Sequence, residues 1–543
     1  MSLEKLKGKT FGQVETKEKT EQEEQLSKHV FVTDKSNSIE TKIVLEENFH
    51  IVRPQTLLFD ENETRMILVY LPSKIEIETG KGDTKSKKID FANTAYFVIH
   101  RPNEKIAKKK EILSYDSPEL KENYKMDILT RWEKVRWNTK DIDDWIEATE
   151  PIEPKKVYEL LDIATRKYID FPEDYDCIYF NLWIIGTYFY ELFEAYPGTD
   201  LTGTKRAGKS KVLEFLKYVC FNALMSPDMT GSSLFRIIEG TGASMLLDET
   251  ESFKDRKNET AQLVRRLIMQ GMLRGQHVIR SESKDNSFTP KTYNIYSPKA
   301  MAHISSLDDV MQDRFIKLTM KRTKSKELLN IWPSKKDPAF QQIRNYCYRL
   351  FLDYAYEIYD LQKEAQSKCK VSGRELQLWT PIVTLALFFE KHGLTGIIEN
   401  IQNFTGISSH SRQLEDEETN YDLKILIFID KEGVKIANDP DINTKNVIGW
   451  ITIGELYERL ESPENLKEYE INPDYFKRKH LTATLQRLGF VSERKSPGIS
   501  YCVTRNVVNE IKERMSMDNE QEQIENKQQE RPKPNSLDEF KET

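Results

Sequence analysis

The chain has 543 residues, which at roughly 150 residues per domain indicates three or four domains. Its most apolar stretch, 177–193, contains Asn181 and Glu191, so it predicts a buried core helix and excludes a membrane span. With 81 basic against 88 acidic residues the net charge is −7, which excludes a uniformly basic nucleic-acid coat. Any nucleic-acid binding therefore needs local basic patches.

Five cysteines lie far apart without a CxxC pair, and the N-terminus has no apolar leader, so we expect reduced thiols in a cytoplasmic protein. Polar, charged ends at 1–28 and 516–543 predict disordered tails. Between 29 and 115, HVFVTD, TKIVLEE, MILVYLP, KIEIET and TAYFVIH predict separate strands of a β-rich N-terminal domain. Residues 116–195 predict a helical collar, because KKVYELLDIATRKYIDF repeats apolar residues at helical spacing.

The strongest motif is GTKRAGKS at 203–210, which fits the phosphate-binding pattern G-x-x-x-x-G-K-[ST]. The two glycines permit a tight turn whose N–H groups face phosphate, Lys209 pairs with the β- and γ-phosphates, and Ser210 binds magnesium. SKVLEFLKYVC then places the loop at a helix N-terminus, which favours anions. The expected nucleotide contacts are Gly203, Thr204, Lys205, Arg206, Ala207, Gly208, Lys209, Ser210 and Lys211.

The segment before this loop, YPGTDLTG, is poorly apolar, whereas buried parallel strands are usually rich in Val, Ile and Leu. A glycine-rich turn without a ligand is therefore the alternative. A second motif, ASMLLDETE, follows with Asp248 placed 39 residues after Lys209. We expect Asp248 to hold magnesium and Glu249 to polarise the attacking water, with an exposed strand end as the alternative.

Together with SPKAMAHISSLDDVMQDRFIKLTMKR, these two motifs resemble the core of an AAA+ P-loop ATPase over roughly 195–400. The chain is most similar to ATPase domains of plasmid, phage and archaeal mobile-element replication proteins, near the superfamily 3 and minichromosome-maintenance helicases. This resemblance implies an ATPase core at 196–325 and a helical lid at 326–414, with Trp379 and Leu385 in the core of the lid.

The resemblance also implies further roles. His303 is nearest the sensor 1 position, which usually holds Asn or Thr, and a strand-end histidine is the alternative. Arg314 in QDRF matches an arginine finger that reaches the γ-phosphate of a neighbouring subunit, or else forms a surface salt bridge. Arg374 matches sensor 2 in the lid. A finger acting in trans implies a ring, which we expect to be a hexamer.

Between the second motif and sensor 1, HVIRSE and TYNIY predict two strands around the polar turn KDNS. In the helicases that the sequence resembles, a hairpin here enters the ring channel and touches DNA. The candidate contacts are Arg280, Lys284 and Lys291, and an ordinary exposed hairpin is the alternative.

At 415–515, helices over YDLKILIFID, ITIGELYERL and NPDYFKRKHLTATLQRLGF precede the hairpin VSERKSPGISYCVT, which is a winged-helix order. We expect the third helix to start at a cap on Asn472 or Asp474 and to stop at Gly489. Six basic residues oppose two acidic ones over 474–495 and predict a duplex-DNA surface, with a protein-contact module as the alternative. They are Lys477, Arg478, Lys479, Arg487, Arg494 and Lys495.

The sequence thus predicts an α/β P-loop AAA+ ATPase core with a helical lid, a β-rich N-terminal domain and a C-terminal winged helix. ATP and Mg²⁺ are the expected ligands. The function favoured is a DNA translocase or helicase that replicates a plasmid, virus or other mobile element, with single-stranded DNA in the ring channel and duplex DNA at the winged helix. An ATP-switched initiator or loader, or a protein-remodelling ATPase, are the alternatives.

Overall fold

The computed structural model divides into two compact units, Met1–Thr405 and Gly406–Thr543, each described by itself below. The predicted tails at 1–28 and 516–543 lie outside the residues that the structure describes. The described residues are 29–34, 39–44, 50–79, 86–104, 109–225, 230–248, 257–284, 287–303, 311, 313–419, 421–439, 448–471, 477–495 and 498–514.

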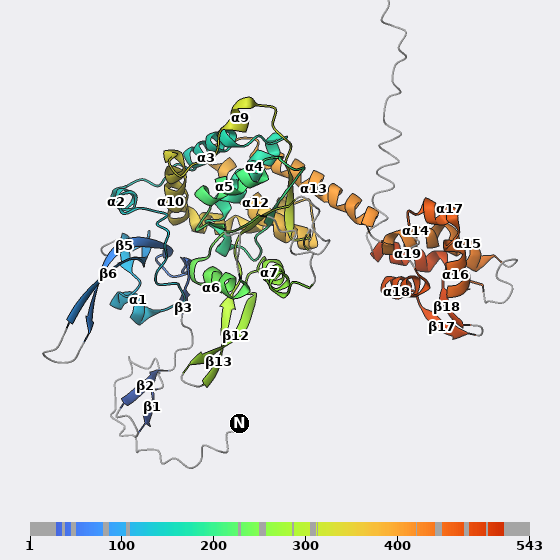
Figure 1. Cartoon of the computed structure of the whole chain (residues 1–543), viewed down its shortest axis with the longest axis horizontal. Helices are drawn as coiled ribbons and strands as arrows, with labels where there is room; N and C mark the ends of the chain where they lie inside the picture. Colours follow the sequence, from blue (N-terminus) through green and yellow to red (C-terminus); the bar gives the residue numbers. More distant parts are fainter. Residues whose placement is uncertain are drawn as a thin grey trace, which may run out of the picture. The chain divides into compact units, whose positions relative to one another are not determined.

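A parallel five-stranded sheet forms the centre of the first unit, in the order β10-β11-β14-β9-β15 (Figure 1). From β9 the chain crosses to β10 at the far edge, so β9 lies at a point where the strand order reverses. Ligands of open parallel sheets bind beyond the carboxyl ends of the strands at such a point. The strands are β9 (Gly198–Thr202), β10 (Leu224–Met225), β11 (Met245–Leu247), β14 (Lys299–Ala302) and β15 (Phe315–Thr319).

Helices cover both faces of this sheet, because alternate residues of each strand point to opposite sides. Leu246 of β11 packs into the same core as α5 and α10, whereas its neighbours Met245 and Leu247 pack with α6 and α7. The predicted α/β fold is therefore confirmed. The covering helices are α5 (Lys209–Val219), α6 (Gly231–Thr241), α7 (Glu259–Gln270) and α10 (Pro338–Asp360).

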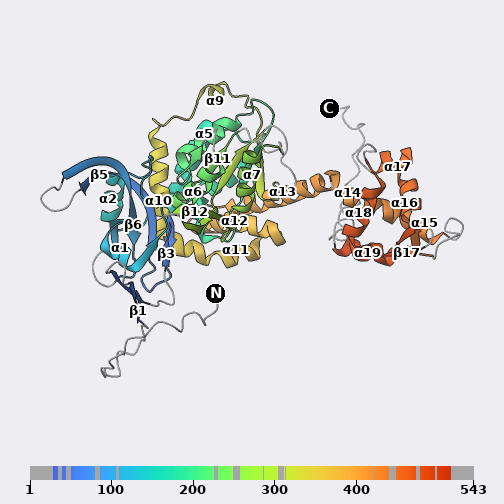
Figure 2. The same ribbon diagram turned by 60° about the horizontal axis from the view of Figure 1, so that its bottom comes forward.

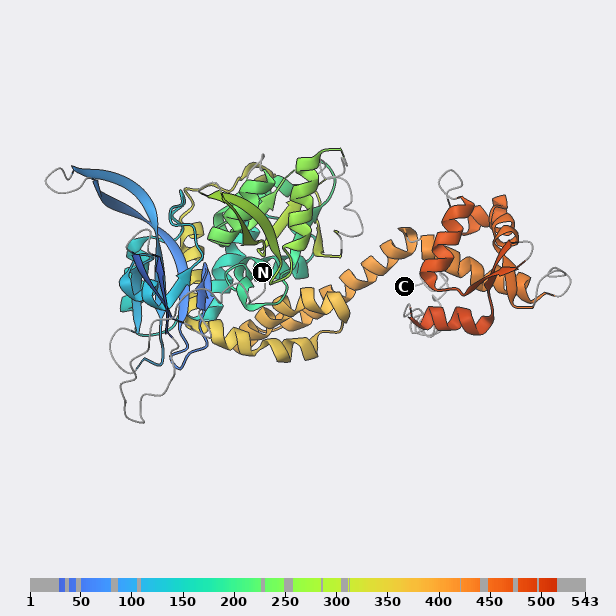
Figure 3. The same ribbon diagram turned by 90° about the horizontal axis from the view of Figure 1, so that it is seen from below.

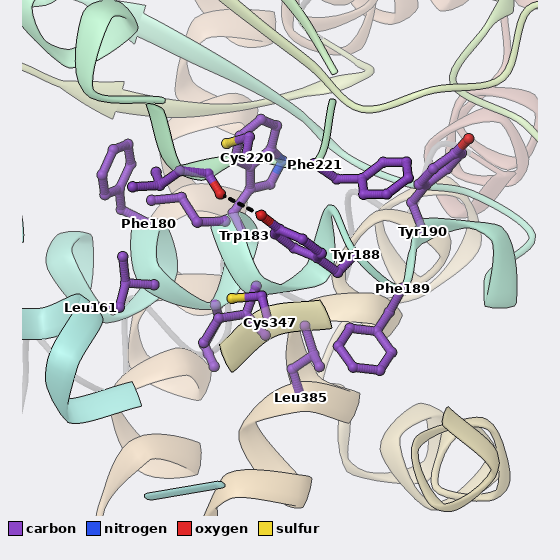
Figure 4. Close-up of a cluster of buried hydrophobic side chains, with 14 of the residues drawn as sticks. Leu161, Phe180, Trp183, Tyr188, Phe189, Tyr190, Cys220, Phe221, Cys347 and Leu385 are labelled. Carbon is purple, nitrogen blue, oxygen red and sulfur yellow. Dashed lines mark hydrogen bonds between the residues drawn. The ribbon is translucent and has the colours of Figure 1, made fainter. Parts of the chain in front are cut away.

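The largest hydrophobic core of the described residues lies where α5 meets helices that precede β9 and helices that follow β15 (Figure 4). Tyr188 is buried there, and its hydroxyl donates a 2.8 Å hydrogen bond to the carbonyl of Val219. These helices are α3 (Pro154–Tyr168), α4 (Asp174–Gly186), α11 (Gln362–Lys368), α12 (Gly373–Lys391) and α13 (Ile397–Thr419). The short helix α9 (Lys326–Asn330) has no buried residue and is not part of this core.

The buried helix predicted over 177–193 is shorter than expected. It ends at Gly186, and the chain then turns into a short 3-10 segment, Tyr190–Leu192. A Cβ atom at Gly186 would lie 2.2 Å from the Tyr196 hydroxyl, so the position accepts only glycine without rearrangement. Within the described ranges, no helix is long and apolar enough to cross a membrane.

An antiparallel sheet, β4-β5-β6-β7, packs beside α10 in the first unit (Figure 2). Val69 on one face belongs to the core shared with α10, while Leu68 and Tyr70 on the other face pack with α1. The remaining elements are β1 (His29–Asp34), β2 (Ile39–Val44), β3 (His50–Val52), β4 (Gln55–Leu57), β5 (Arg65–Thr79), β6 (Ser86–His100), β7 (Lys110–Ser114), β8 (Tyr124–Met126), α1 (Pro118–Asn123) and α2 (Thr139–Glu147).

The sequence predicted that MILVYLP and KIEIET form separate strands, and this prediction is wrong. Both belong to β5, which pairs with β6 along its whole length (Figure 3). Pro72 lies within β5, and among the described residues β5 pairs with β4 only at 65–67. Beyond that segment β5 is an edge strand on its other side, where proline is tolerated.

The second unit joins a small antiparallel sheet, β16-β18-β17, to a group of helices. The helix predicted over YDLKILIFID is present and ends at Phe428. The hairpin and the stop at Gly489, whose φ is 84°, are confirmed. ITIGELYERL begins as a strand, and the basic helix starts at Arg478. The predicted caps Asn472 and Asp474 lie outside the described residues. The elements are α14 (Tyr421–Phe428), α15 (Val434–Asn438), β16 (Trp450–Thr452), α16 (Ile453–Leu460), α17 (Pro463–Glu468), α18 (Arg478–Leu488), β17 (Ser492–Lys495), β18 (Gly498–Cys502) and α19 (Arg505–Arg514).

Candidate functional site

The GTKRAGKS segment forms a tight loop between the carboxyl end of β9 and the first residue of α5. Gly203 has a φ of +145°, and a Cβ atom there would lie 2.4 Å from the carbonyl oxygen of Met320. Gly208 caps α5 with a φ of +92°, a conformation that other residues adopt only with strain. Both glycines are therefore required by the backbone, and the loop delivers a helix N-terminus to the sheet edge.

Lys209 folds back over this loop. Its Nζ donates hydrogen bonds to the carbonyls of Gly203 at 2.6 Å and Thr204 at 3.1 Å. The ammonium group is thus held at the mouth of the turn, and the side chains of Lys205, Arg206 and Ser210 are exposed beside it. This arrangement suits a polyphosphate, because backbone N–H groups, a fixed positive charge and a free-standing hydroxyl surround one space.

A cavity of about 910 Å³ opens beside the loop, within the size range of small-ligand sites. Residues 205–212 line one side, and Asp248, which directly follows β11, lines the same cavity. The structure therefore brings together the loop and the predicted magnesium ligand. Glu249, the predicted water-polarising residue, lies outside the described residues.

The segment that follows β15 forms an apolar wall of the cavity, which sequence reasoning missed. Leu329 and Trp332 line the cavity although their side chains are 50% and 57% exposed. Lys211 fixes this wall to α5, because its Nζ donates a 2.5 Å hydrogen bond to the carbonyl of Leu328. An exposed tryptophan beside a phosphate-binding loop suits the flat, apolar face of a nucleobase.

His303, the predicted sensor 1 residue, follows β14 and lines the cavity. It is buried, and its Nε2 is hydrogen-bonded to the carboxylate of Asp200 in β9. Sequence reasoning did not single out Asp200. The signal that could have found it was the polar character of the strand before the loop.

Arg314 lies at the amino ends of the sheet strands, whereas the phosphate-binding loop of the same chain follows the carboxyl end of β9. Arg314 directly precedes β15, which runs parallel to β9, so it lies near the amino ends of both strands. Arg374, in the first turn of α12, forms a 3.4 Å ion pair with Asp313. Arg374 therefore pairs with the residue that directly precedes Arg314, and neither arginine is among the residues that line the cavity.

Strands β12 (His277–Lys284) and β13 (Ser287–Asn294) form the predicted hairpin, with Arg280 opposite Lys291. Basic groups lie over aromatic rings here: the Arg280 guanidinium is 5.4 Å from the ring centre of Phe235, and the Lys291 ammonium is 4.9 Å from that of Tyr293. The side chain of Lys284 lies outside the described residues. Phe235 belongs to α6, and both rings are buried, so the groups that the hairpin offers to a ligand are the positive ones.

The predicted basic residues of the second unit differ in their surroundings. Lys477, Arg478 and Lys479 are exposed around the start of α18, and Arg494 is exposed in β17. Arg487 is held by Asp422 of α14 through hydrogen bonds of 2.8 Å and 2.5 Å, and this pairing lowers the pKa of Asp422. The side chain of Lys495 lies outside the described residues.

No protein-family model and no curated protein sequence matches the chain. Its structure is similar to that of a full-length MCM homolog from Methanopyrus kandleri, at 8% identity over 64% of this chain and 78% of that chain, with a TM-score of 0.33. It is also similar to the NrS-1 C-terminal region, at 12% identity over 76% and 94% of the two chains (TM-score 0.27). The JCV helicase is similar at 13% identity over 53% and 74% (TM-score 0.18). Similarities this weak transfer no activity, so the functional interpretation rests on the residues of the site.

Proposed function

We propose that the first unit binds ATP with Mg²⁺ and hydrolyses it. One observation carries this proposal: a single cavity is lined by the phosphate-binding loop, by Asp248 at the end of an adjacent strand, and by an apolar wall. In this assignment Lys209 neutralises the β- and γ-phosphates, and Ser210 and Asp248 hold the metal ion. The bound metal supplies charge neutralisation at the phosphates, and Glu249 orients the attacking water.

We infer that hydrolysis needs a second copy of the chain. Arg314 lies across the sheet from its own loop, so it suits the γ-phosphate of a neighbouring subunit, where it stabilises the charge of the transition state. Arg374, close to Asp313, belongs to the same edge and is assigned to the same interface. Repetition of this head-to-tail contact closes a ring, for which we propose six subunits.

The proposed work is translocation along DNA during replication of a plasmid, virus or other mobile element. Contact between the hairpin β12–β13 and single-stranded DNA is supported by Arg280 and Lys291, which lie opposite each other and whose charges suit phosphates. The second unit, with a helix followed by a β-hairpin, is assigned as a winged helix. Its exposed Lys477, Arg478 and Lys479 at the start of α18 suit duplex phosphates.

The exposed basic start of α18 also favours a second candidate, an ATP-switched initiator or loader that binds duplex DNA without processive unwinding. Steady-state ATPase activity with and without single-stranded and duplex DNA separates the two, with Lys209→Ala as the inactive control. Stimulation by single-stranded DNA together with unwinding of a forked duplex supports the translocase. Duplex binding without unwinding supports the initiator. DNA-independent hydrolysis contradicts both and favours protein remodelling.

A further inference from the structure

The strand that leads into the phosphate-binding loop carries polar side chains that its burial does not explain. β9 lies between β14 and β15, and both Thr199 and Asp200 are buried in it. The Thr199 hydroxyl lies 3.0 Å from that of Tyr179, so it is satisfied within the core. Asp200 is only 4% exposed, and a buried carboxylate is strongly unfavourable unless it is paired.

The partner of Asp200 is His303, from the neighbouring strand. Asp200 lies opposite Met301 in the register of β9 and β14, and His303 comes two residues later, on the same face of the sheet. The side chains of His303 and Asp200 are 3% and 5% exposed, and the His303 Nε2 contacts the Asp200 carboxylate. The pair therefore connects the strand before the loop to a strand end that lines the cavity.

The pairing with Asp200 determines which ring nitrogen of His303 can bind a further group. An ionised carboxylate only accepts hydrogen bonds, so Nε2 carries a hydrogen and Nδ1 is the atom left for a further partner. Nδ1 is buried and has no hydrogen-bond partner in the part of the chain that the structure describes. Both nitrogens of an imidazolium ring are donors, and a phosphate oxygen is the acceptor that a charged Nδ1–H donor suits.

We propose that Asp200 is a positioning residue, which orients His303 to bind the terminal phosphate of a nucleoside triphosphate. This inference rests on the proposed function. β11, β14 and β9 are adjacent and parallel, so Asp248, His303 and the loop lie at one edge of the sheet. The charged residues lining the cavity there are Asp170, Lys205, Arg206, Lys209, Lys211, Asp248 and Lys321. Because ADP lacks the terminal phosphate, the pair favours ATP over ADP.

The test is the affinity of each variant for ATP and for ADP with Mg²⁺, measured by equilibrium titration beside thermal unfolding. We expect Asp200→Asn to weaken ATP binding about tenfold or more, as for loss of a charged hydrogen bond, and to leave ADP binding within about twofold. His303→Asn keeps an uncharged donor and should lose less ATP affinity than His303→Ala. Thr199→Val is the matched control: it removes the neighbouring polar group of β9 and should leave the ATP-to-ADP ratio unchanged.

Three outcomes separate the possibilities. Equal losses of ATP and ADP affinity in Asp200→Asn, with a lower unfolding temperature, would overturn the inference and leave the pair a purely structural contact. If Asp200→Asn does not fold, unchanged ATP-to-ADP ratios in both His303 variants would overturn it equally. A wild-type protein that binds neither nucleotide would instead refute the proposed function. The double variant Asp200→Asn/His303→Asn should lose no more than His303→Asn alone, since the positioned group is already absent.

Discussion

The proposed nucleotide cavity and the proposed DNA surfaces are built in opposite ways. In the cavity, backbone geometry fixes each group: Gly203 and Gly208 shape the loop, and the loop's own carbonyls hold Lys209. On the second unit the basic residues are exposed side chains, and their neighbours decide which are available. Arg487, for example, is already engaged by Asp422. A motif therefore identifies cavity residues individually, whereas charge content identifies a DNA surface only as a whole.

The largest effect is expected from Arg314. Arg314→Ala should lower kcat for ATP about a thousandfold while ATP binding persists, because the proposed finger acts only on transition-state charge. Mixing Arg314→Ala with Lys209→Ala measures whether it acts in trans. Activity should reappear in the mixture, where an intact loop meets an intact finger from another subunit. Absence of any recovery would place Arg314 in its own site or make it a surface ion pair.

Trp332 tests whether the apolar wall belongs to the site. Trp332→Ala should raise the KM for ATP about tenfold with little change in kcat, as expected when one aromatic face is removed from a base. Trp332→Phe retains a ring and should recover most of the affinity. A KM for Trp332→Ala that equals the wild-type value would remove this wall from the nucleotide site.

Variants in α18 test whether exposed basic side chains at its start contribute more to DNA binding than Arg487, which is paired with Asp422. Replacing Lys477, Arg478 and Lys479 with alanine should reduce the salt dependence of duplex binding by about 2.7 in the slope of log K against log salt, at about 0.9 per phosphate contact. Arg487→Ala is the matched control and should change the slope little, because Asp422 holds its guanidinium. If Arg487→Ala reduced the slope as much as each of the other three replacements, Arg487 would contact DNA despite its pairing with Asp422.

The smallest effect concerns Glu239 of α6, which accepts a hydrogen bond from the Asn294 backbone N–H. Burial, reinforced by Asp127, raises its pKa from 4.5 to about 8. The folded state therefore binds this proton more tightly than the unfolded state, so stability should fall as pH rises from about 4.5 to 8. Glu239→Gln should flatten the dependence of unfolding temperature on pH in this window. A curve parallel to that of the wild type would show that Glu239 titrates normally.

Sequence patterns located the local features of the fold and missed those that depend on distant contacts. The loop, the strand ending at Asp248 and the β12–β13 hairpin follow from residue spacing. At the end of α4, Gly186 lies against Tyr196, whose hydroxyl donates a 2.6 Å hydrogen bond to the carbonyl of Trp183, a contact between residues that the helical pattern does not relate. The continuity of β5 through Pro72 depends on which edge of the strand is paired.

The same division holds within the candidate site. Lys209 and Asp248 were predicted because each stands at a fixed place in a motif. The sequence showed only that YPGTDLTG is poorly apolar for a buried strand, and the pairing of Asp200 with His303 becomes visible when β9 and β14 lie side by side. Trp332 had no signal in the sequence, because its place in the cavity depends on how the chain returns after β15.

The central claim is that the cavity beside the GTKRAGKS loop binds ATP, and a direct titration tests it. Mg²⁺-ATP is titrated into the wild-type protein, Lys209→Ala and Lys217→Ala. Lys217 is a matched control on the same helix, where its ammonium pairs with Glu214 at 3.0 Å, away from the loop. The account predicts saturable binding by the wild type and Lys217→Ala, with loss of at least about a hundredfold in Lys209→Ala. Equal affinity of all three proteins would contradict it.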